Sequence, residues 1–380
     1  MINAAIIDCK RLKTNISNIK SSLPNGCRIA AVVKGDAYGH GLTGIAGILD
    51  HTEDVSMLVT SSFKEALHII RAGIGKQILI LNDIPTEEIL GELKLFPEII
   101  DLILGQVIFS MHSYSDLYDF NKLGRERSSK INVHIRLDPS TGIKGLPGKD
   151  FKKALSEIES FDFLNISGVY GHLYSMYVDD PAKQADDAAA FDSLIQMIPG
   201  SLRSKMTVHL YSSSLFNHYT ENTYDMIRVG VLMYGVYMEP CPDTHTPDVV
   251  DIITIKGRVL KTSSLISGQN IDYSGTVENG VKKVALISLG SWDIPFFLTC
   301  KDPVIGIRGH LCRVIGSPCM DSCLCDISDF DDIMESDEAV ILSDQKGLRF
   351  KDWIKRSDLN FGNCQMLFSG MERIEKYYVE

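Results

Sequence analysis

The chain has 380 residues, of which 44% are hydrophobic and 23% charged, a composition that excludes a largely disordered protein and allows one large domain or two. Its 49 acidic residues outnumber 38 lysines and arginines, and the resulting net charge of −11 argues against a nucleic-acid surface, which needs a basic face. No apolar run approaches the ~18 residues of a membrane-spanning helix, and the N-terminal segment lacks the apolar stretch of a signal peptide. Nine scattered cysteines indicate reduced thiols, so we expect a cytoplasmic protein.

Short apolar, β-branched runs recur through the first 235 residues and predict eight strands. They are Cys27–Val33, Ser56–Thr60, Gln77–Leu81, Ile100–Leu104, Ile131–Leu137, Ile166–Leu173, Met206–Tyr211 and Met226–Val231. Helical patterns precede or separate them at Cys9–Ser22, Ser62–Gly73, Thr86–Phe96 and Pro181–Ile198. Eight strands alternating with helices are typical of a (β/α)8 TIM-type barrel, with a doubly wound open sheet as the alternative.

The pattern changes after Gly235, where a linker rich in proline leads into strand-like runs separated by turns. These runs are Val249–Leu260, Val281–Leu289, Pro303–Ile307, Cys312–Ile315 and Ala339–Leu342. We therefore predict a barrel over residues 1–235 and a mostly β C-terminal domain over residues 236–380.

Polar residues follow the predicted barrel strands at their C-terminal ends, where barrel enzymes carry their chemistry. They are Lys34, Arg136, Asp138, His172, Ser212, Ser213, Arg228 and Gly230. Each residue alone is more often a solvated surface group or a satisfied core group than a catalyst. Their conjunction at one mouth of the barrel favours an active site.

Two other motifs match a dinucleotide-binding site and a zinc site only in part. The run Gly39–Gly44 fits G-x-G-x-x-G, but an insertion separates it from the preceding strand, and the next strand ends without the acid that a dinucleotide site needs. Cys319, Cys323 and Cys325 lack the spacing of a zinc site, so we expect no metal.

The stretch Ala31–Gly41 resembles the cofactor-lysine signature of alanine racemases, which are pyridoxal-phosphate (PLP) enzymes built from a barrel and a β-domain. The resemblance continues in the same order through the rest of the chain. Further matches are Ile7-Asp8, Asn15, Met226–Gly230, Met233–Gly235, Asp272–Gly275 and Cys319–Asp321.

The resemblance implies a role for each matching residue. Lys34 would form the Schiff base with PLP, and the phosphate would be held by Tyr38, Ser213, Gly230 and Val231. Arg228 would face the pyridine nitrogen with His209 behind it, and His172 would link Arg228 to Tyr273 of the partner subunit. Met320 would lie in the substrate site with Asp321 behind it. A homodimer with shared sites is implied.

The family's chemistry implies racemisation of a small amino acid, by default L-alanine to D-alanine. Lys34 would serve as the base on one face of the substrate and Tyr273 on the other. Arg228, because an arginine does not readily give up its proton, would not protonate the cofactor's ring nitrogen, which favours racemisation over most other PLP reactions. The alternatives are a PLP-dependent decarboxylase or aldolase on the same fold, and a non-catalytic PLP-binding protein.

The sequence departs from the family pattern around the substrate. Arg136 stands where the family has a lysine that is often carbamylated, and Lys144 falls near the arginine that contacts the substrate carboxylate. Two tyrosines that narrow the family's site correspond to Ser291 and Ser369, and Ser212 replaces an asparagine. These changes predict a wider or more polar pocket that admits serine or a longer side chain.

Overall fold

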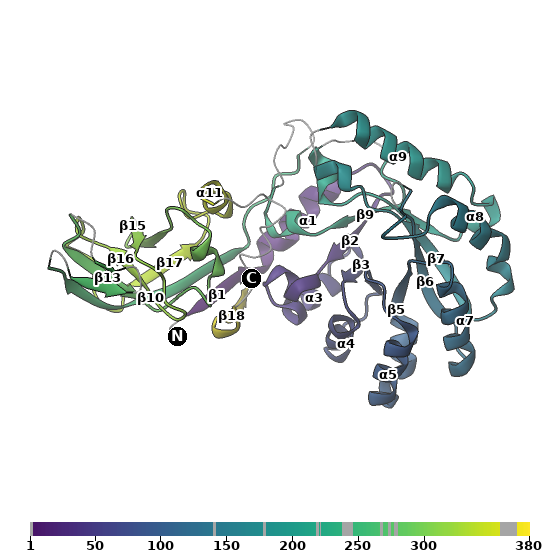
Figure 1. Ribbon diagram of the computed structural model, residues 1–380, viewed down its shortest axis with the longest axis horizontal. Helices are drawn as coiled ribbons and strands as arrows, with labels where there is room; N and C mark the ends of the chain where they lie inside the picture. Colours follow the sequence, from purple (N-terminus) through teal and green to yellow (C-terminus); the bar gives the residue numbers. More distant parts are fainter. Residues whose placement is uncertain are drawn as a thin grey trace.

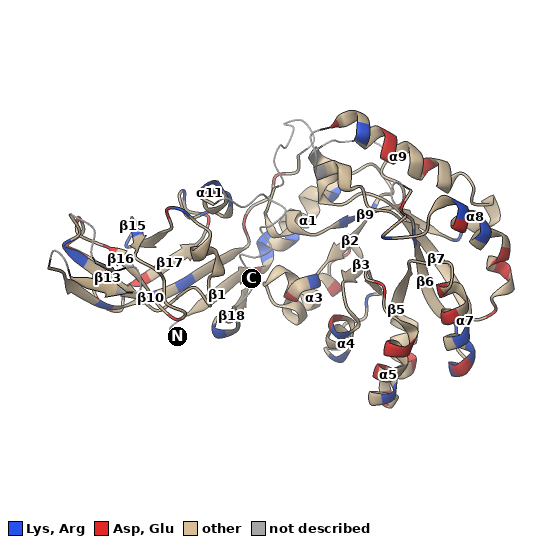
Figure 2. Cartoon of the chain, in the orientation of Figure 1, with Lys and Arg blue, Asp and Glu red and all other residues tan. Residues whose placement is uncertain are grey.

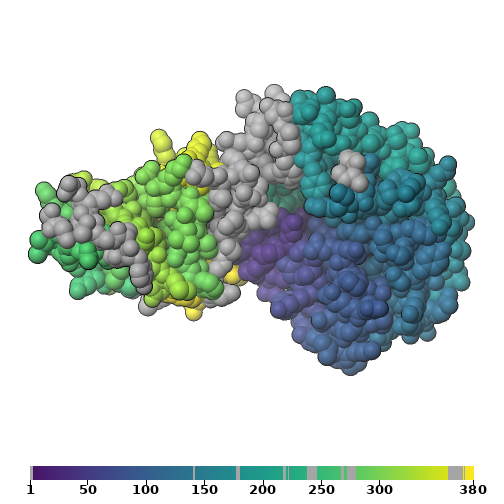
Figure 3. Space-filling model, in the orientation of Figure 1, coloured from purple at the N-terminus to yellow at the C-terminus, as the bar shows by residue number. Residues whose placement is uncertain are grey.

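A computed structural model describes residues 3–139, 142–177, 180–217, 220, 222–237, 246–266, 269–272, 275–276, 280–357 and 371–380. The molecule has two lobes, a barrel surrounded by helices and a smaller β-rich lobe that extends away from it (Figures 1 and 3). In these ranges no helix is long and apolar enough to cross a bilayer.

The larger lobe is a barrel of eight parallel strands in the order β8-β7-β6-β5-β4-β3-β2-β9. Their bounds are β2 (Arg28–Val32), β3 (Val55–Thr60), β4 (Ile78–Ile80), β5 (Val107–Met111), β6 (Ile131–Arg136), β7 (Leu164–Tyr170), β8 (Thr207–His209) and β9 (Met226–Val229). A parallel bridge between Ser212 and Arg228 joins the two ends of this sheet. The predicted TIM-type barrel is confirmed, and the closure excludes a doubly wound open sheet.

Helices cover the outside of the barrel. They are α1 (Cys9–Ser21), α3 (Leu42–Asp50), α4 (Phe63–Arg71), α5 (Thr86–Leu95), α6 (Ile100–Gln106), α7 (Asp116–Arg127), α8 (Gly148–Glu157), α9 (Pro181–Ile195) and α10 (Gly200–Arg203). Figure 2 shows acidic and basic residues along outer helices such as α5, α7, α8 and α9. This placement leaves the apolar faces of the helices to pack on the strands.

One predicted strand was wrong. Residues Ile100–Gln106 form helix α6, and the fourth strand is Val107–Met111, all of whose residues are buried. Two short apolar runs follow one another here, and the period of so short a run does not separate a buried helix from a buried strand.

Alternate residues of the barrel strands point to opposite faces, as strand geometry requires. On β2, Ala30 and Val32 pack inside the barrel with Met57 and Val59 of β3. Ile29, the neighbour of Ala30, belongs instead to the large core beneath the helices. The strand ends therefore deliver successive residues to defined sides of the barrel mouth.

The smaller lobe is an eight-stranded sheet in the order β13-β16-β15-β14-β17-β10-β1-β18, in which β13 also pairs with β10. Its strands are β1 (Ala4–Asp8), β10 (Ile253–Ser264), β13 (Lys283–Ile287), β14 (Val304–Ile307), β15 (His310–Ile315), β16 (Cys323–Asp326), β17 (Glu338–Leu342) and β18 (Glu375–Val379), beside a hairpin of β11 (Asn270–Asp272) and β12 (Gly275–Thr276). The mostly β C-terminal domain is thus confirmed. Strand β1 pairs antiparallel with β10 and parallel with β18, so the first strand of the chain joins this sheet and not the barrel.

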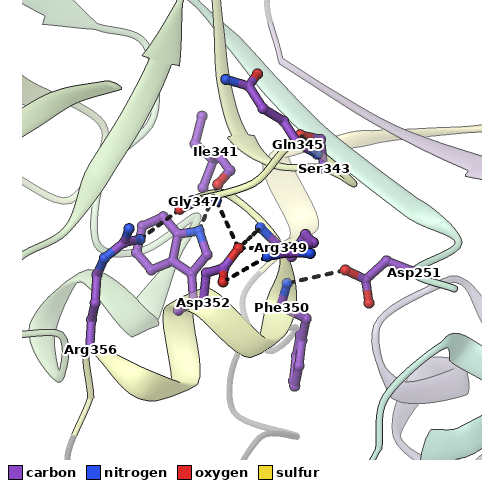
Figure 4. Close-up of polar contacts among 10 residues, drawn as sticks. Asp251, Ile341, Ser343, Gln345, Gly347, Arg349, Phe350, Asp352 and Arg356 are labelled. Carbon is purple, nitrogen blue, oxygen red and sulfur yellow. Dashed lines mark hydrogen bonds and ion pairs between the residues drawn. The ribbon is translucent and has the colours of Figure 1, made fainter. Parts of the chain in front are cut away.

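Helix α11 (Phe350–Lys355) is fixed to the second sheet by the contacts in Figure 4. The indole nitrogen of Trp353 donates to the carbonyl of Ile341 on β17 at 2.8 Å. Asp251, in the segment that leads from the barrel into β10, accepts from the backbone N–H of Phe350 at 3.2 Å. Burial raises the pKa of Asp251 to about 6.

Candidate active site

Lys34 lies two residues after the end of β2, at the start of a short left-handed turn labelled α2 (Lys34–Tyr38). Gly35, Asp36, Ala37 and Tyr38 all have positive φ, between 54° and 64°. For L-residues this conformation is unfavourable by roughly 1–2 kcal/mol each, so it persists only where neighbouring groups hold it. The turn connects Lys34 at its start with Tyr38 at its end.

Glu65 of helix α4 binds the start of this turn. Its carboxylate accepts from the backbone N–H of Gly35 at 2.6 Å and from the backbone N–H of Ser61 at 3.0 Å. Burial lowers the pKa of Lys34, Glu65 opposes that shift, and the positive charges of Arg228 and Arg136 add to it. A desolvated amine with a lowered pKa is the form of lysine that acts as a nucleophile or base.

Tyr38 and the residues after strands β8 and β9 converge on one cradle. Ser213, the first residue of the 3-10 turn η4 (Ser213–Asn217), accepts from the backbone N–H of Gly230 at 3.1 Å. A Cβ at Gly230 would lie 2.6 Å from the hydroxyl of Tyr38, so only glycine allows this approach. Val231 follows as the first residue of η5 (Val231–Tyr234). Hydroxyl and backbone N–H donors at the start of such turns suit a phosphate.

Arg228 is buried beneath this cradle and is held by four acceptors. Its Nη1 contacts Nδ1 and the carbonyl of His209 at 2.7 and 3.1 Å, and its Nη2 donates to the carbonyls of Gly171 and Leu210 at 2.6 and 2.9 Å. The guanidinium also lies 5.3 Å from the ring centre of Tyr170. These contacts fix the orientation of the guanidinium.

Behind Arg228, two imidazoles form a hydrogen-bonded chain. Burial keeps His209 and His134 neutral, lowering the pKa of His209 well below its ordinary value and that of His134 to about 3. Because Arg228 can only donate, Nδ1 of His209 must accept, and its proton sits on Nε2. That Nε2–H donates to Nδ1 of His134 at 3.0 Å. Each of these side-chain hydrogen bonds, from Arg228 to His209 and from His209 to His134, therefore has a defined donor and a defined acceptor.

His172 follows β7 and faces the mouth among four cations. Burial lowers its pKa to about 3, and the charges of Arg228, Arg136, Lys34 and Lys144 contribute to the shift. These four basic residues, which come from three segments of the chain, are thus brought around one imidazole.

Tyr174 joins two of those cations at the rim. Its hydroxyl accepts from Nη2 of Arg136 at 3.0 Å, and Nζ of Lys144 lies 4.7 Å from its ring centre. Its ring also meets that of His172 edge to face, with 4.7 Å between the centres. In the part of the chain that the structure describes, neither Arg136 nor Lys144 has a carboxylate within ion-pair distance.

Three predicted residues, Met320, Asp321 and Ser291, belong to the second lobe. Met320 is exposed and Asp321 follows it, in the loop before β16. Ser291 lies beside that loop, with its hydroxyl donating to the carbonyl of Cys319 at 3.1 Å. The predicted residues Tyr273 and Ser369 lie outside the described residues.

Sequence reasoning missed four residues of this site. Glu65, His134, Tyr170 and Tyr174 were not singled out. Of these, His134 could have been found, because it precedes Arg136 by two positions on β6 and therefore shares its face of the strand. Within the described ranges, no cluster of His, Cys, Asp or Glu could hold a metal ion.

Comparison with known proteins agrees with this architecture. The family model "Alanine racemase, N-terminal domain" matches residues 7–238, and "Alanine racemase, C-terminal domain" matches residues 252–378. The chain belongs to the alanine racemase family. The resemblance inferred from sequence motifs is therefore confirmed, and it places the chain among isomerases that act on amino acids.

Individual relatives cover nearly the whole chain. A protein of Clostridium kluyveri named alanine racemase is 28% identical over 348 residues, which are 90% of this chain and 85% of the relative. The alanine racemase structure of Clostridium difficile 630 superposes with a TM-score of 0.88 at 20% identity, covering 100% of this chain and 96% of the other. A Bartonella henselae alanine racemase with covalently bound pyridoxal phosphate gives a TM-score of 0.80 at 19% identity, with full coverage of both chains.

Proposed function

We propose that the protein is a PLP-dependent racemase of a small amino acid, with L-alanine as the default substrate. The proposal depends mainly on one observation. The desolvated amine of Lys34 lies at the same barrel mouth as Arg228, whose guanidinium contacts four acceptors. Family membership supports it, and relatives over the same length are named alanine racemase.

The residues present fit PLP. Lys34 would hold the cofactor covalently, and the cradle of Tyr38, Ser213, Gly230 and Val231 would bind its phosphate. Arg228 would face the ring nitrogen and, because a guanidinium keeps its proton, would leave that nitrogen unprotonated. When bound, the cofactor supplies a conjugated ring that stabilises negative charge at the substrate Cα.

Racemisation requires that a proton leave one face of Cα and return on the other. We propose that the amine of Lys34 moves the proton on one face, which its lowered pKa favours at neutral pH. For the opposite face we propose the phenol of Tyr273, brought by a second copy of the chain in a homodimer. Neutral His172, next to Arg228, would lie between the two subunits' groups.

The substrate carboxylate has two candidate partners at the rim, Arg136 and Lys144, which both contact Tyr174. Arg136 could bind it through two parallel N–H groups, whereas Lys144 offers only a point charge. The small Ser291 supports a pocket that also accepts serine. Exposed Met320 beside it would contribute to the same pocket, with Asp321 behind it.

The test is a panel of single L-amino acids incubated with PLP-loaded protein in deuterated water, read by chiral chromatography and mass spectrometry. We expect the D-enantiomer with deuterium at Cα from alanine, and from serine if the pocket is widened. Loss of carbon dioxide or of an aldehyde would replace the proposal by the decarboxylase or aldolase alternative. Bound PLP without exchange on any amino acid would indicate a non-catalytic binding protein.

A further inference from the structure

The last strand of the chain, β18, lies against the segment that follows the cofactor lysine. The hydroxyl of Tyr378 donates to the carbonyl of His40 at 2.8 Å. Its ring covers Gly41 and Gly44, where an added Cβ would lie 2.0 and 2.1 Å from ring atoms or the hydroxyl. Gly41 and Gly44 of the G-x-G-x-x-G run therefore leave room for the ring of Tyr378. This packing explains two glycines of a motif that does not fit a dinucleotide site.

A second contact joins the same strand to the middle of the left-handed turn. Nζ of Lys376 lies 2.8 Å from Oδ2 of Asp36. The other oxygen of that carboxylate accepts from the backbone N–H of Leu42, the first residue of α3, at 2.7 Å. Asp36 thus bridges the turn, the start of α3 and the end of the chain.

Strand β18 is itself well anchored. It pairs in parallel with β1 over its whole length, and β1 runs directly into α1. Figure 1 shows the C-terminus next to α1 and α3, between the two lobes. A rigid strand is therefore in a position to hold the turn from outside the barrel.

We propose that Lys376 and Tyr378 are positioning residues, which keep the left-handed turn in the conformation that presents Lys34 and Tyr38 to the cofactor. The inference rests on the proposed PLP function. The turn is intrinsically unfavourable and would carry one of the proposed cofactor contacts at each end, Lys34 and Tyr38. The two contacts of β18 fall at its middle and just beyond it. Loosening them lets the backbone relax and displaces both ends together.

The experiment compares Lys376→Ala, Tyr378→Phe and the double variant with the wild type. The first readout is the rate at which PLP leaves the loaded protein, and the second is amide hydrogen exchange at residues 37–41 in unloaded protein. Each lost hydrogen bond is expected to accelerate PLP release about threefold to tenfold, with faster exchange in the turn. Lys376→Arg should restore the wild-type rate, and kcat should fall more than KM changes, because neither side chain touches the substrate.

Two matched variants remove polar contacts of the same chain end without touching the turn. Tyr377 donates to Glu375 on its own strand, and Lys13 pairs with Glu380 at 3.2 Å. We expect Tyr377→Phe and Lys13→Ala to leave both readouts unchanged. Equal acceleration in these controls, or wild-type behaviour of the double variant, overturns the inference. A wild type that binds no PLP at Lys34, tested by borohydride fixation, overturns the proposed function instead.

Discussion

Buried neutral imidazoles should make the barrel sensitive to mild acid, and His134 offers the sharpest test. An unfolded histidine titrates near ~6.5, whereas burial lowers the pKa of His134 to about 3. Between these two values the unfolded chain binds more protons than the folded one. The stability contribution is therefore fully present above about pH 6.5 and is lost as the pH falls towards 3, by ~1.4 kcal/mol per pH unit.

His134→Asn removes this titration while keeping an acceptor for the Nε2–H of His209, since the asparagine oxygen can take the place of Nδ1. The smaller side chain lowers stability by a constant amount at every pH. Between pH 6.5 and 5.5, however, the variant's free energy of unfolding should fall by ~1 kcal/mol less than that of the wild type. Urea unfolding followed by far-UV circular dichroism at several pH values measures both slopes, with exposed His51→Asn as the matched control.

Equal slopes for the wild type and His134→Asn would refute the reasoning, because His134 would then not be a buried neutral imidazole.

The hydrogen-bond chain behind Arg228 gives a second prediction, which concerns stability at neutral pH. His134→Leu leaves the Nε2–H of His209 buried without an acceptor, which should destabilise the protein by a further ~1–3 kcal/mol relative to His134→Asn.

Two other predictions concern the segment around Lys34. Gly44→Ala places a methyl group 2.1 Å from the Tyr378 ring and should lower the free energy of unfolding by ~1–3 kcal/mol, an effect that disappears in a Tyr378→Ala background. Glu65→Gln can still accept from the N–H of Gly35 but removes the carboxylate that raises the pKa of Lys34, so that pKa should fall further. An NMR titration of the Lys34 amine in unloaded protein measures the shift, and an unchanged or higher pKa would contradict the assignment.

The barrel and most of its mouth could be predicted from the sequence because the information is local. Each strand ends where an apolar run meets a polar residue, and in a parallel barrel all these ends share one face. The positions of Lys34, His172 and Arg228 at the ends of predicted strands were sufficient to predict that they share the barrel mouth. The family motifs then assigned a chemistry to each residue.

What the sequence did not predict depends on pairing between distant segments. Strand β1 reads as part of the barrel domain because it directly precedes helix α1, yet it pairs with β10 and β18. The partner of Gly41 and Gly44 is a tyrosine near the other end of the chain. No local period or motif connects such segments, so the division at residue 235, drawn from local pattern alone, stays a prediction.

These distant pairings change how the second lobe relates to the chemistry. Its sheet contains both the first and the last strand of the chain, and each of them leads back to the barrel: β1 continues into α1, and β18 contacts the turn that carries Lys34. A substitution on β18 can therefore act on Lys34 of its own chain. A residue such as Tyr273, if it acts in the partner's site as proposed, gives the same lobe a second route to catalysis. Because the two routes run through different strands, variants of β18 should alter cofactor retention, whereas variants of Tyr273 should alter proton transfer with the cofactor still bound.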